Sequence, residues 1–234
     1  MKKLFLLLFS FICAGAYAQL PGGAFSIGGG PTVGYQDIKF DDINSQLTLA
    51  GIPALKNGVV YFGGGGFVDI PFKNFKWLRV GGFARGFSAR TSGVSGGVTK
   101  SALVDFGEGG ITLDYVFRFS AIDITIGTSL GTGEYKLNLY QSGSASSTWT
   151  NLWSGTTNNS SRNLKTRIFS YQPALGIGTK LANFLYAKLN AGYTLSSHTD
   201  WKADDDMSIS GIPEGIKPDG FNINFTINAG LFFR

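Results

Sequence analysis

The chain has 234 residues, of which 43% are hydrophobic and 15% charged, and its formal net charge is +5. The basic residues are spread out without a run or a stripe, which argues against a nucleic-acid partner. The single cysteine, Cys13, lies near the amino terminus, so no disulfide bond is expected to hold the rest of the chain together.

The first 18 residues have the pattern of a secretory signal peptide. Lys2 and Lys3 precede an apolar run that ends at Cys13, and Ala16-Tyr17-Ala18 matches an A-x-A cleavage site. The run is shorter than the about 20 residues that a membrane helix requires. We therefore predict a signal peptide over residues 1–18 and one mature domain over residues 19–234. Because two of the basic residues lie in the signal, the mature net charge is +3.

Beyond the signal, polar and apolar residues alternate in eight segments, which predicts strands with one apolar face. These segments are 24–35, 59–70, 77–90, 102–119, 122–140, 166–181, 185–197 and 221–234. Their connections are long and short in turn, with polar loops predicted at 91–99, 141–163 and 198–220. The first segment contains Pro31, which donates no ladder hydrogen bond.

A single helix is predicted, in the first long connection. Asp41 or Asp42 is expected to cap it, and Ile43, Leu47 and Ala50 share one face. A helix this short is marginal in water by itself. We therefore expect it to act as a lid on an apolar barrel rim, with a gate or a partner-binding element as the alternative.

Charged residues decide which face of the third segment points inward. Placing Leu78 and Val80 on the lipid side sends Arg79 and Arg85 inward, whereas the opposite choice costs about 2–4 kcal/mol for each arginine at mid-membrane. The fourth and fifth segments change parity at Gly109-Gly110 and at 131–133, which predicts bulges there. After the second change, Tyr135, Leu137 and Leu139 are expected to face outward.

The last segment has the clearest alternation. Its apolar residues are Phe221, Ile223, Phe225, Ile227, Ala229, Leu231 and Phe233, and mostly polar or small residues stand between them. This terminal strand resembles the carboxy-terminal signature of bacterial outer-membrane barrels. The resemblance implies that the barrel-assembly machinery reads Phe221, Ile223, Phe225, Ile227, Leu231 and Phe233 as its signal.

Together these patterns predict an all-β fold, an eight-stranded antiparallel up-and-down transmembrane β-barrel similar to the small OmpA/OmpX-type proteins. The expected location is the outer membrane of a Gram-negative cell envelope. The expected partners are outer-membrane lipid, lipopolysaccharide and the assembly machinery, and the expected state is a monomer without a cofactor or a metal. A barrel of eight strands is filled by its own side chains. We accordingly predict a lumen network of Arg79, Arg85, Glu108, Asp114, Arg118, Asp123, Glu134, Lys136 and Lys188.

Three functions are compatible with this architecture. The first is a structural or surface-interaction role without catalysis. The second is a carrier or channel for small hydrophobic molecules, favoured by Pro31 and by the two parity changes. The third is a lipid A-modifying enzyme, for which Ser196, His198 and Asp200 supply a candidate nucleophile, base and acid. The acidic residues at 200–206 form a candidate cation-binding loop, although their spacing lacks an EF-hand pattern.

Overall fold

The computed structural model describes residues 26–72, 75–143, 159–204, 207–213 and 215–232. The predicted signal peptide and Phe233 lie outside these residues. No helix in the described part of the chain is long and apolar enough to cross a membrane.

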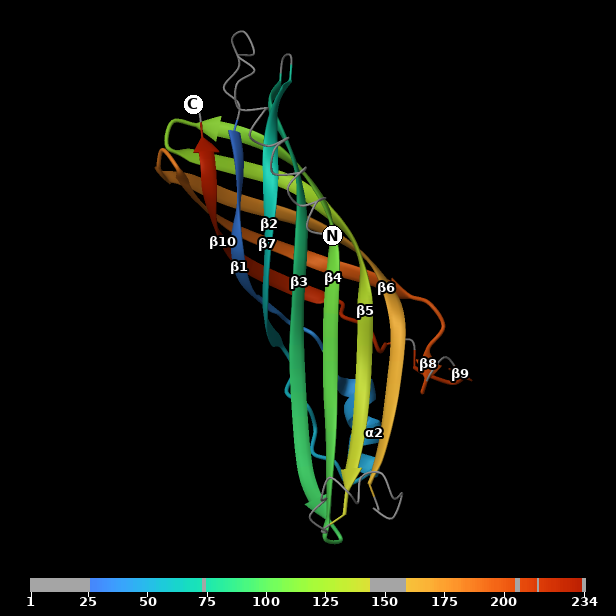
Figure 1. Ribbon diagram of the computed structural model, residues 1–234. Coiled ribbons are helices and arrows are strands. Elements are labelled where there is room, and N and C mark those ends of the chain that lie inside the picture. Colours follow the sequence, from blue (N-terminus) through green and yellow to red (C-terminus); the bar gives the residue numbers. More distant parts are fainter. Residues whose placement is uncertain (1–25, 73–74, 144–158, 205–206, 214, 233–234) are drawn as a thin grey trace, which may run out of the picture.

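Eight long strands form the wall of a closed barrel (Figure 1). They are β1 (Ser26–Gln36), β2 (Val59–Phe72), β3 (Phe75–Ser95), β4 (Val98–Phe119), β5 (Ile122–Ser142), β6 (Ser160–Ala182), β7 (Leu185–His198) and β10 (Gly220–Phe232). All neighbours pair antiparallel, and the β1–β10 and β5–β6 pairings close the ring. The predicted fold class is therefore confirmed, and the strands from β2 to β7 are longer than expected.

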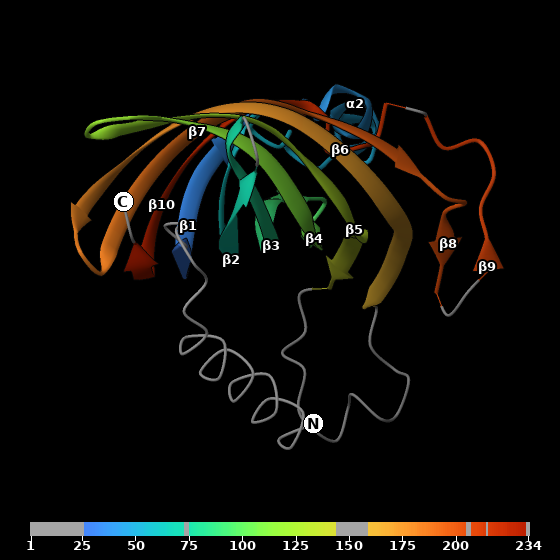
Figure 2. The ribbon, with the colours of Figure 1, turned by 90° about the horizontal axis from the view of Figure 1, so that it is seen from above.

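The short turns at 120–121 and 183–184 lie at one end of the barrel, which we name the short-turn end. Three smaller elements lie at the opposite end, which we name the α2 end. They are the helix α2 (Asp41–Leu49) and the two-residue strands β8 (Lys202–Ala203) and β9 (Met207–Ser208). β8 pairs with β6 near the α2 end, at Leu164 and Lys165, and β9 pairs with β8. Seen from above, β8 and β9 stand beside β6 and outside the ring (Figure 2).

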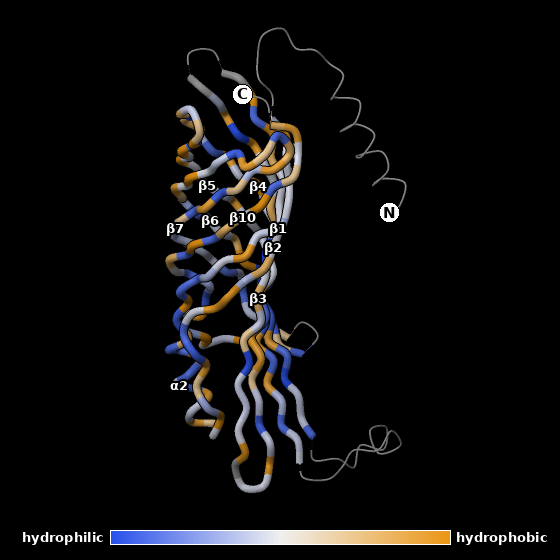
Figure 3. Tube along the Cα trace, turned by 90° about the vertical axis from the view of Figure 1, so that its left-hand side faces the viewer, coloured by the Kyte–Doolittle hydropathy of each residue, from blue (hydrophilic) through white to orange (hydrophobic). Residues whose placement is uncertain are grey.

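The outer face of the wall carries a belt of exposed apolar side chains. It includes Val33, Tyr35, Phe62, Ile70, Val80, Ile111, Leu113, Phe119, Ile122, Ile124, Ile126, Leu130, Phe169, Tyr171, Leu175, Ile177, Leu181, Leu189, Tyr193, Leu195, Phe221, Ile223, Phe225, Ile227 and Leu231. Apolar and polar residues alternate along the strands (Figure 3). An apolar outside on a closed ring is the arrangement that a bilayer requires, because every backbone group is paired and no sheet edge meets lipid.

Inward-facing glycines allow the wall to curve tightly. A Cβ atom on Gly30 would lie 2.0 Å from the carbonyl oxygen of Ile227 on the neighbouring strand, and one on Gly65 would lie 2.4 Å from that of Gly82. By contrast, a Cβ atom on Gly107 would meet nothing within 4 Å. The glycine content of the chain thus follows partly from close strand approach at these positions.

The loop predicted at 91–99 is wrong, because β3 and β4 continue there as a hairpin. The residues from Phe87 to Ser95 pair in unbroken register with those from Phe106 to Val98. Gly96 and Gly97 form the turn with φ angles of 60° and 76°, the left-handed conformation that a two-residue hairpin requires at both positions. The loop predicted at 141–163 likewise shortens as β5 and β6 extend, and that at 198–220 contains β8 and β9.

The predicted bulges are also wrong. The β4–β5 register runs without a shift through Gly109, Gly110 and residues 131–133. The polarity of the interior changes instead. Tyr135 and Leu137 face inward, at 1% and 8% exposure, where the inside of the barrel becomes apolar beneath α2. An alternation pattern reports the face of a strand, but it does not say which face is inside when both environments are apolar.

The helix prediction is correct in position and wrong in its cap. Ile43 and Leu47 are buried as predicted, but Phe40 occupies the N-cap and no side chain caps the helix. Asp41 and Asp42 lie in the first turn, where acidic groups interact favourably with the helix dipole. Ala50 is the exposed C-cap residue and does not join the buried face.

Candidate functional site

The barrel lumen contains most of the buried charged groups of the described residues. A first cluster lies toward the short-turn end and involves Asp69, Arg79, Arg118 and Asp123. Arg79 donates to Asp69 through Nε at 2.7 Å and through Nη2 at 3.2 Å. Arg118 also donates to Asp69, and Asp123 lies 3.8 Å from Arg79 and 4.0 Å from Arg118. Two cations and two anions therefore balance each other, with Asp69, Arg79 and Asp123 buried and the Arg118 side chain 15% exposed.

Aromatic rings enclose this cluster. The guanidinium carbon of Arg79 lies 3.9 Å from the centre of the Phe67 ring, and that of Arg118 lies 4.1 Å from the Trp77 ring. Tyr186 accepts a hydrogen bond from Arg79 Nη1 at 3.2 Å and packs against Phe67. The rings exclude water and attract the cations through their faces, so both effects hold the arginines in place.

Two further ion pairs lie deeper in the lumen. Lys188 on β7 donates to Asp114 on β4. Arg85 on β3 donates to Glu108 on β4, and Glu108 accepts a second hydrogen bond from the hydroxyl of Ser170 at 2.5 Å. The Lys188–Asp114 pair joins β7 and β4, which are not neighbours in the ring, and so it spans the lumen. The Arg85–Glu108 pair joins the neighbouring strands β3 and β4.

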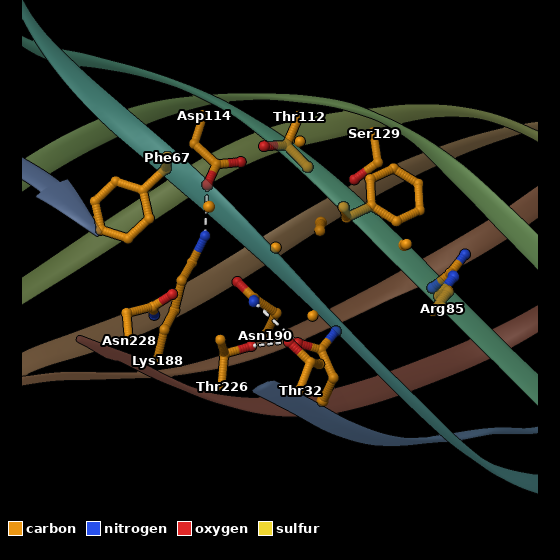
Figure 4. Close-up of a pocket in the computed structure, with 18 of the residues that line it drawn as sticks. Thr32, Phe67, Arg85, Thr112, Asp114, Ser129, Lys188, Asn190, Thr226 and Asn228 are labelled. Atoms are coloured by element: carbon orange, nitrogen blue, oxygen red, sulfur yellow. Dashed lines mark hydrogen bonds and ion pairs between the residues drawn. The ribbon is translucent and has the colours of Figure 1, made fainter. Parts of the chain in front are cut away.

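A cavity of about 130 Å³ lies beside these two ion pairs, and Arg85, Asp114 and Lys188 line it (Figure 4). Its lining includes Thr32, Asn190, Asn224, Thr226 and Asn228, together with the backbone of the glycine run at 64–66. Thr32 and Thr226 share a hydrogen bond of 2.8 Å, and Asn190 donates to Asn224 at 3.1 Å. Hydroxyl and amide linings of this kind suit a few bound waters, since a water requires two to four polar partners.

An apolar core closes the lumen at the α2 end. It comprises Ile38, Phe40, Ile43, Leu47, Ile52, Leu55, Val59, Tyr61, Phe87, Ala102, Val104, Phe106, Tyr135, Leu137, Ile168, Trp201 and Ile216. The residues come from α2 and its flanking segments, from five wall strands and from the connection between β7 and β10. Helix α2 therefore packs into the mouth of the barrel with its apolar face inward, as expected of a lid.

The structure brings seven of the nine predicted lumen residues into the interior. They are Arg79, Arg85, Glu108, Asp114, Arg118, Asp123 and Lys188. Glu134 and Lys136 lie on the outer face instead, where they pair at 2.8 Å with side chains about half exposed. Their predicted inward position followed from the bulge at 131–133 that the continuous register rules out.

Asp69 is the lumen residue that the sequence interpretation left out of the network. It is fully buried and receives hydrogen bonds from two arginines. It shares its strand parity with Tyr61 and Phe67, which also face the interior. Its role as the shared partner was not visible, because Arg118 lies on a strand that is not adjacent to β2.

The residues considered for catalysis are not assembled into a triad. Ser196 donates its hydroxyl to Asp219 at 2.5 Å, whereas the His198 ring contacts the Thr199 carbonyl at 2.9 Å. Asp200 is exposed at the edge of the mouth. The described acidic residues do not form a cluster of three or more metal-ligating groups.

Asp204 of the acidic loop has a specific structural contact. It accepts hydrogen bonds from the backbone N–H of Asn163 at 2.9 Å and from Arg162 at 2.6 Å. The hydrogen bond from Asn163 is the main reason that the pKa of the Asp204 carboxyl lies below its usual value, and the hydrogen bond from Arg162 lowers it further. These two hydrogen bonds connect the β8 segment to the part of β6 near the α2 end.

The candidate assembly signal lies on the lipid side of the last strand. Phe221, Ile223, Phe225, Ile227 and Leu231 are between 39% and 50% exposed on the outer face of β10. Their recognition by the assembly machinery stays a prediction.

No family model matches the chain, and no curated protein matches it. Among solved structures, Ail, the attachment invasion locus protein of Yersinia pestis, is 14% identical and aligns over 90% of this chain and 99% of its own, with a TM-score of 0.38. The same protein in complex with the heparin analogue sucrose octasulfate gives 11% identity, the same coverage and a TM-score of 0.37. The outer membrane protease OmpT from Escherichia coli is 9% identical over 89% of this chain and 95% of its own, with a TM-score of 0.35.

At these TM-scores the assignment rests on the geometry of the chain itself. A ring of eight antiparallel strands leaves no unpaired edge in the wall, and its outward side chains are apolar around the whole ring. Only a bilayer makes that exterior favourable, and bacterial outer membranes are where such barrels occur. The chain therefore folds as an eight-stranded transmembrane β-barrel, the architecture of small bacterial outer-membrane proteins.

Proposed function

We propose that the protein has a structural or surface-interaction role in the outer membrane and acts without catalysis and without conducting solutes. The filled lumen carries this proposal. Its four cations, Arg79, Arg85, Arg118 and Lys188, face four anions, Asp69, Glu108, Asp114 and Asp123. Separating one buried pair costs about 3–5 kcal/mol, because it leaves an uncompensated charge. A solute crossing the lumen would have to separate several.

The α2 end adds a second barrier of a different kind. The apolar core there would have to open before water or an ion reached the ion pairs from outside. Opening it exposes apolar surface at a cost of about 25 cal/mol for each Å². A polar network and an apolar core in series therefore oppose passage by independent mechanisms.

The carrier alternative loses the features that favoured it. The parity changes at 109–110 and 131–133 reflect a change of interior polarity and leave the wall intact. At Pro31 the β1–β10 pairing is interrupted between Gly29 and Thr32 but resumes in the same register, while the β1–β2 pairing is continuous. The cavity of about 130 Å³ beside the ion pairs is well below the roughly 300–1,000 Å³ of typical ligand pockets, so it offers little room for a hydrophobic cargo.

The parts of the barrel that remain available for interaction are its lipid-facing belt and its outer end. Lipid and lipopolysaccharide would contact the belt, and a monomer is sufficient because the ring closes within one chain. At the α2 end, β3–β6 project beyond the other strands of the wall (Figure 1). We assign the interaction role to this projecting sheet.

Solute uptake by reconstituted vesicles tests the proposal. Proteoliposomes that contain the folded barrel should swell in small sugars, and should take up a small hydrophobic dye, no faster than empty vesicles. Faster uptake of either probe would contradict the proposal and favour the channel or the carrier.

A shortened variant separates a structural role from surface interaction. Ser92 and Ser101 are opposite each other in the β3–β4 hairpin, so residues 93–100 can be replaced by an Asn-Gly turn. Cells that lack the protein are complemented with either form, after folding has been checked by heat-modifiability. If the shortened form restores envelope resistance to detergent but not surface attachment, the projecting sheet has the interaction role.

A further inference from the structure

The hydroxyl of Tyr61 is buried in the lumen, where no described residue pairs with it. Tyr61, on β2, is 2% exposed, and its hydroxyl forms no hydrogen bond of normal geometry with a described residue. The side chain belongs to the apolar core at the α2 end and also lines the lumen cavity of about 130 Å³. Because an unpaired polar group in the interior is costly, this hydroxyl indicates a binding partner inside the cavity.

The strand register brings this hydroxyl toward Asn224. Gly34 on β1 stands opposite Tyr61 on one side and opposite Asn224, on β10, on the other. A Cβ atom on Gly34 would lie 2.5 Å from the Tyr61 hydroxyl oxygen, so a glycine at this position lets the tyrosine reach across β1. Asn224 lines the same cavity. The hydroxyl and the amide therefore face the cavity together, from two strands that do not pair with each other.

The Asn224 amide presents a donor to the cavity. Its Oδ1 accepts a hydrogen bond of 3.1 Å from Asn190 on β7. The polar group that remains is the NH₂, which can only donate, and the Tyr61 hydroxyl can donate as well. Two donors that converge on one space suit an acceptor, which is either an anion or a water oxygen.

The charged side chains around the cavity decide between these two acceptors. Arg79, Arg85 and Lys188 line it, and Asp114 is the one carboxylate among the described residues that do. The carboxylates that pair with the two arginines are not part of the lining. Figure 4 shows Arg85 and Lys188 on opposite sides of the cavity. Because near charges act most strongly in a low-dielectric interior, the potential inside the cavity is positive and favours an anion.

We propose that the lumen cavity is a binding site for one small monovalent anion of the chloride type. The Tyr61 hydroxyl and the Asn224 NH₂ donate to the anion, and the guanidinium of Arg85 and the ammonium of Lys188 balance its charge. The inference goes beyond the proposed surface role and does not depend on it.

The size and the charge of the cavity limit what it takes. One water needs about 10–15 Å³ of such a space, so a halide and a few waters fit into 130 Å³. Typical pockets for organic ligands have about 300–1,000 Å³. A doubly charged anion is disfavoured, because the lining cations already have carboxylate partners and an uncompensated buried charge is costly.

Anomalous diffraction from the full-length barrel tests the site directly. The protein is refolded and crystallised in sodium bromide, because bromide replaces chloride and scatters anomalously. We expect one anomalous peak inside the cavity, within hydrogen-bond distance of the Tyr61 hydroxyl oxygen and the Asn224 Nδ2. Ordered waters in the cavity without an anomalous peak would overturn the proposal.

The folding equilibrium provides a second test. Reversible unfolding is measured in sodium chloride and in sodium gluconate at equal ionic strength, since gluconate is too bulky for the site. Once the site is saturated, a ten-fold rise in chloride should raise the folding equilibrium constant about ten-fold, as expected for one ligand that binds only the folded state. The same stability in both salts at every concentration would contradict the site.

Two lumen variants and one control assign the effect to the cavity. Tyr61→Phe removes one donor to a charged ligand and should weaken the apparent chloride affinity about ten-fold or more. Asn224→Asp places a carboxylate beside the anion and should abolish both the chloride dependence and the bromide peak. Tyr171→Phe removes a hydroxyl from the lipid-facing belt, where Tyr171 is 46% exposed, and should behave like the unchanged protein.

Heat-modifiability verifies the folding of each variant before its chloride dependence is measured. A folded Tyr61→Phe barrel that keeps the full chloride dependence would overturn the proposal, because the anion would then bind without the hydroxyl that indicates the site.

Discussion

Asp69 on β2 and Arg79 on β3 stand directly opposite each other in the barrel wall and are joined by two hydrogen bonds, of 2.7 and 3.2 Å. Both side chains are buried, at 0% and 2% exposure, and Asp69 also accepts from Arg118. The pair is therefore part of the wall pairing and of the lumen network at once, which makes Asp69 the centre of the charge balance at the short-turn end.

Asp69→Asn should destabilise the barrel strongly, because it leaves two buried arginines with one carboxylate between them. The expected loss is about 3–5 kcal/mol of unfolding free energy, typical of a broken buried ion pair. Denaturant unfolding of the barrel in lipid vesicles measures it. The matched control is Asp37→Asn, at an exposed aspartate beyond the end of β1, which should change the free energy by less than about 0.5 kcal/mol. Equal effects of the two substitutions would show that the charge cluster does not stabilise the fold.

Gly30→Ala should impair closure of the ring. The new Cβ atom would lie 2.0 Å from the Ile227 carbonyl oxygen, so β1 and β10 would have to move apart at the seam. We expect a loss of about 1–3 kcal/mol, as for an overpacked site, and a reduced heat-modifiable fraction on unboiled gels. Gly107→Ala is the control, because a Cβ atom there meets nothing within 4 Å. If both variants fold equally well, close strand approach is not the reason for glycine at position 30.

Leu47→Ala should loosen the lid more than the barrel. Leu47 is buried in the mouth core at 3% exposure, and truncating such a leucine costs about 2–5 kcal/mol. The loss should appear as faster proteolysis within residues 37–58 while the strands stay protected, since the wall is held by its own ladder. Leu49→Ala provides the comparison, as Leu49 is 83% exposed. Equal cleavage of the two variants would mean that the buried face of α2 does not hold it in the mouth.

The contact of Asp204 with Asn163 should depend on pH in a defined direction. The pKa of Asp204 is lowered by the Asn163 N–H and then by Arg162, so the folded state favours the charged carboxylate. Its contribution is present in full above the ordinary pKa of an aspartate and is lost as the pH falls through the lowered value. Asn163 amide exchange, compared at each pH with that of Asp204→Asn, should converge with the variant only in that acid range. Convergence at neutral pH would contradict this account.

The sequence predicted the wall well because side-chain alternation has a period of two and the lipid side is uniformly apolar. The facing of Arg79, Arg85 and Lys188 followed directly from that contrast. Prediction failed where the contrast disappears. Beneath α2 the interior is itself apolar, so Tyr135 and Leu137 were assigned to the outside and Glu134 and Lys136 to the inside.

Long-range arrangement was the second limit. The small polar residues of 91–99 are typical of a loop, and only pairing with β4 keeps them in a strand. The shared role of Asp69 depends on Arg118, which reaches it across the lumen from a strand that does not pair with β2. Neither relationship leaves a local signal in the sequence.

The most direct test of the sealed lumen is electrical recording of the purified, folded protein in planar lipid bilayers. A barrel closed by four balanced ion pairs and an apolar mouth should show no defined conductance steps at moderate voltage. Reproducible steps of uniform size would contradict the account, because they require a continuous water path through both the charge network and the core beneath α2.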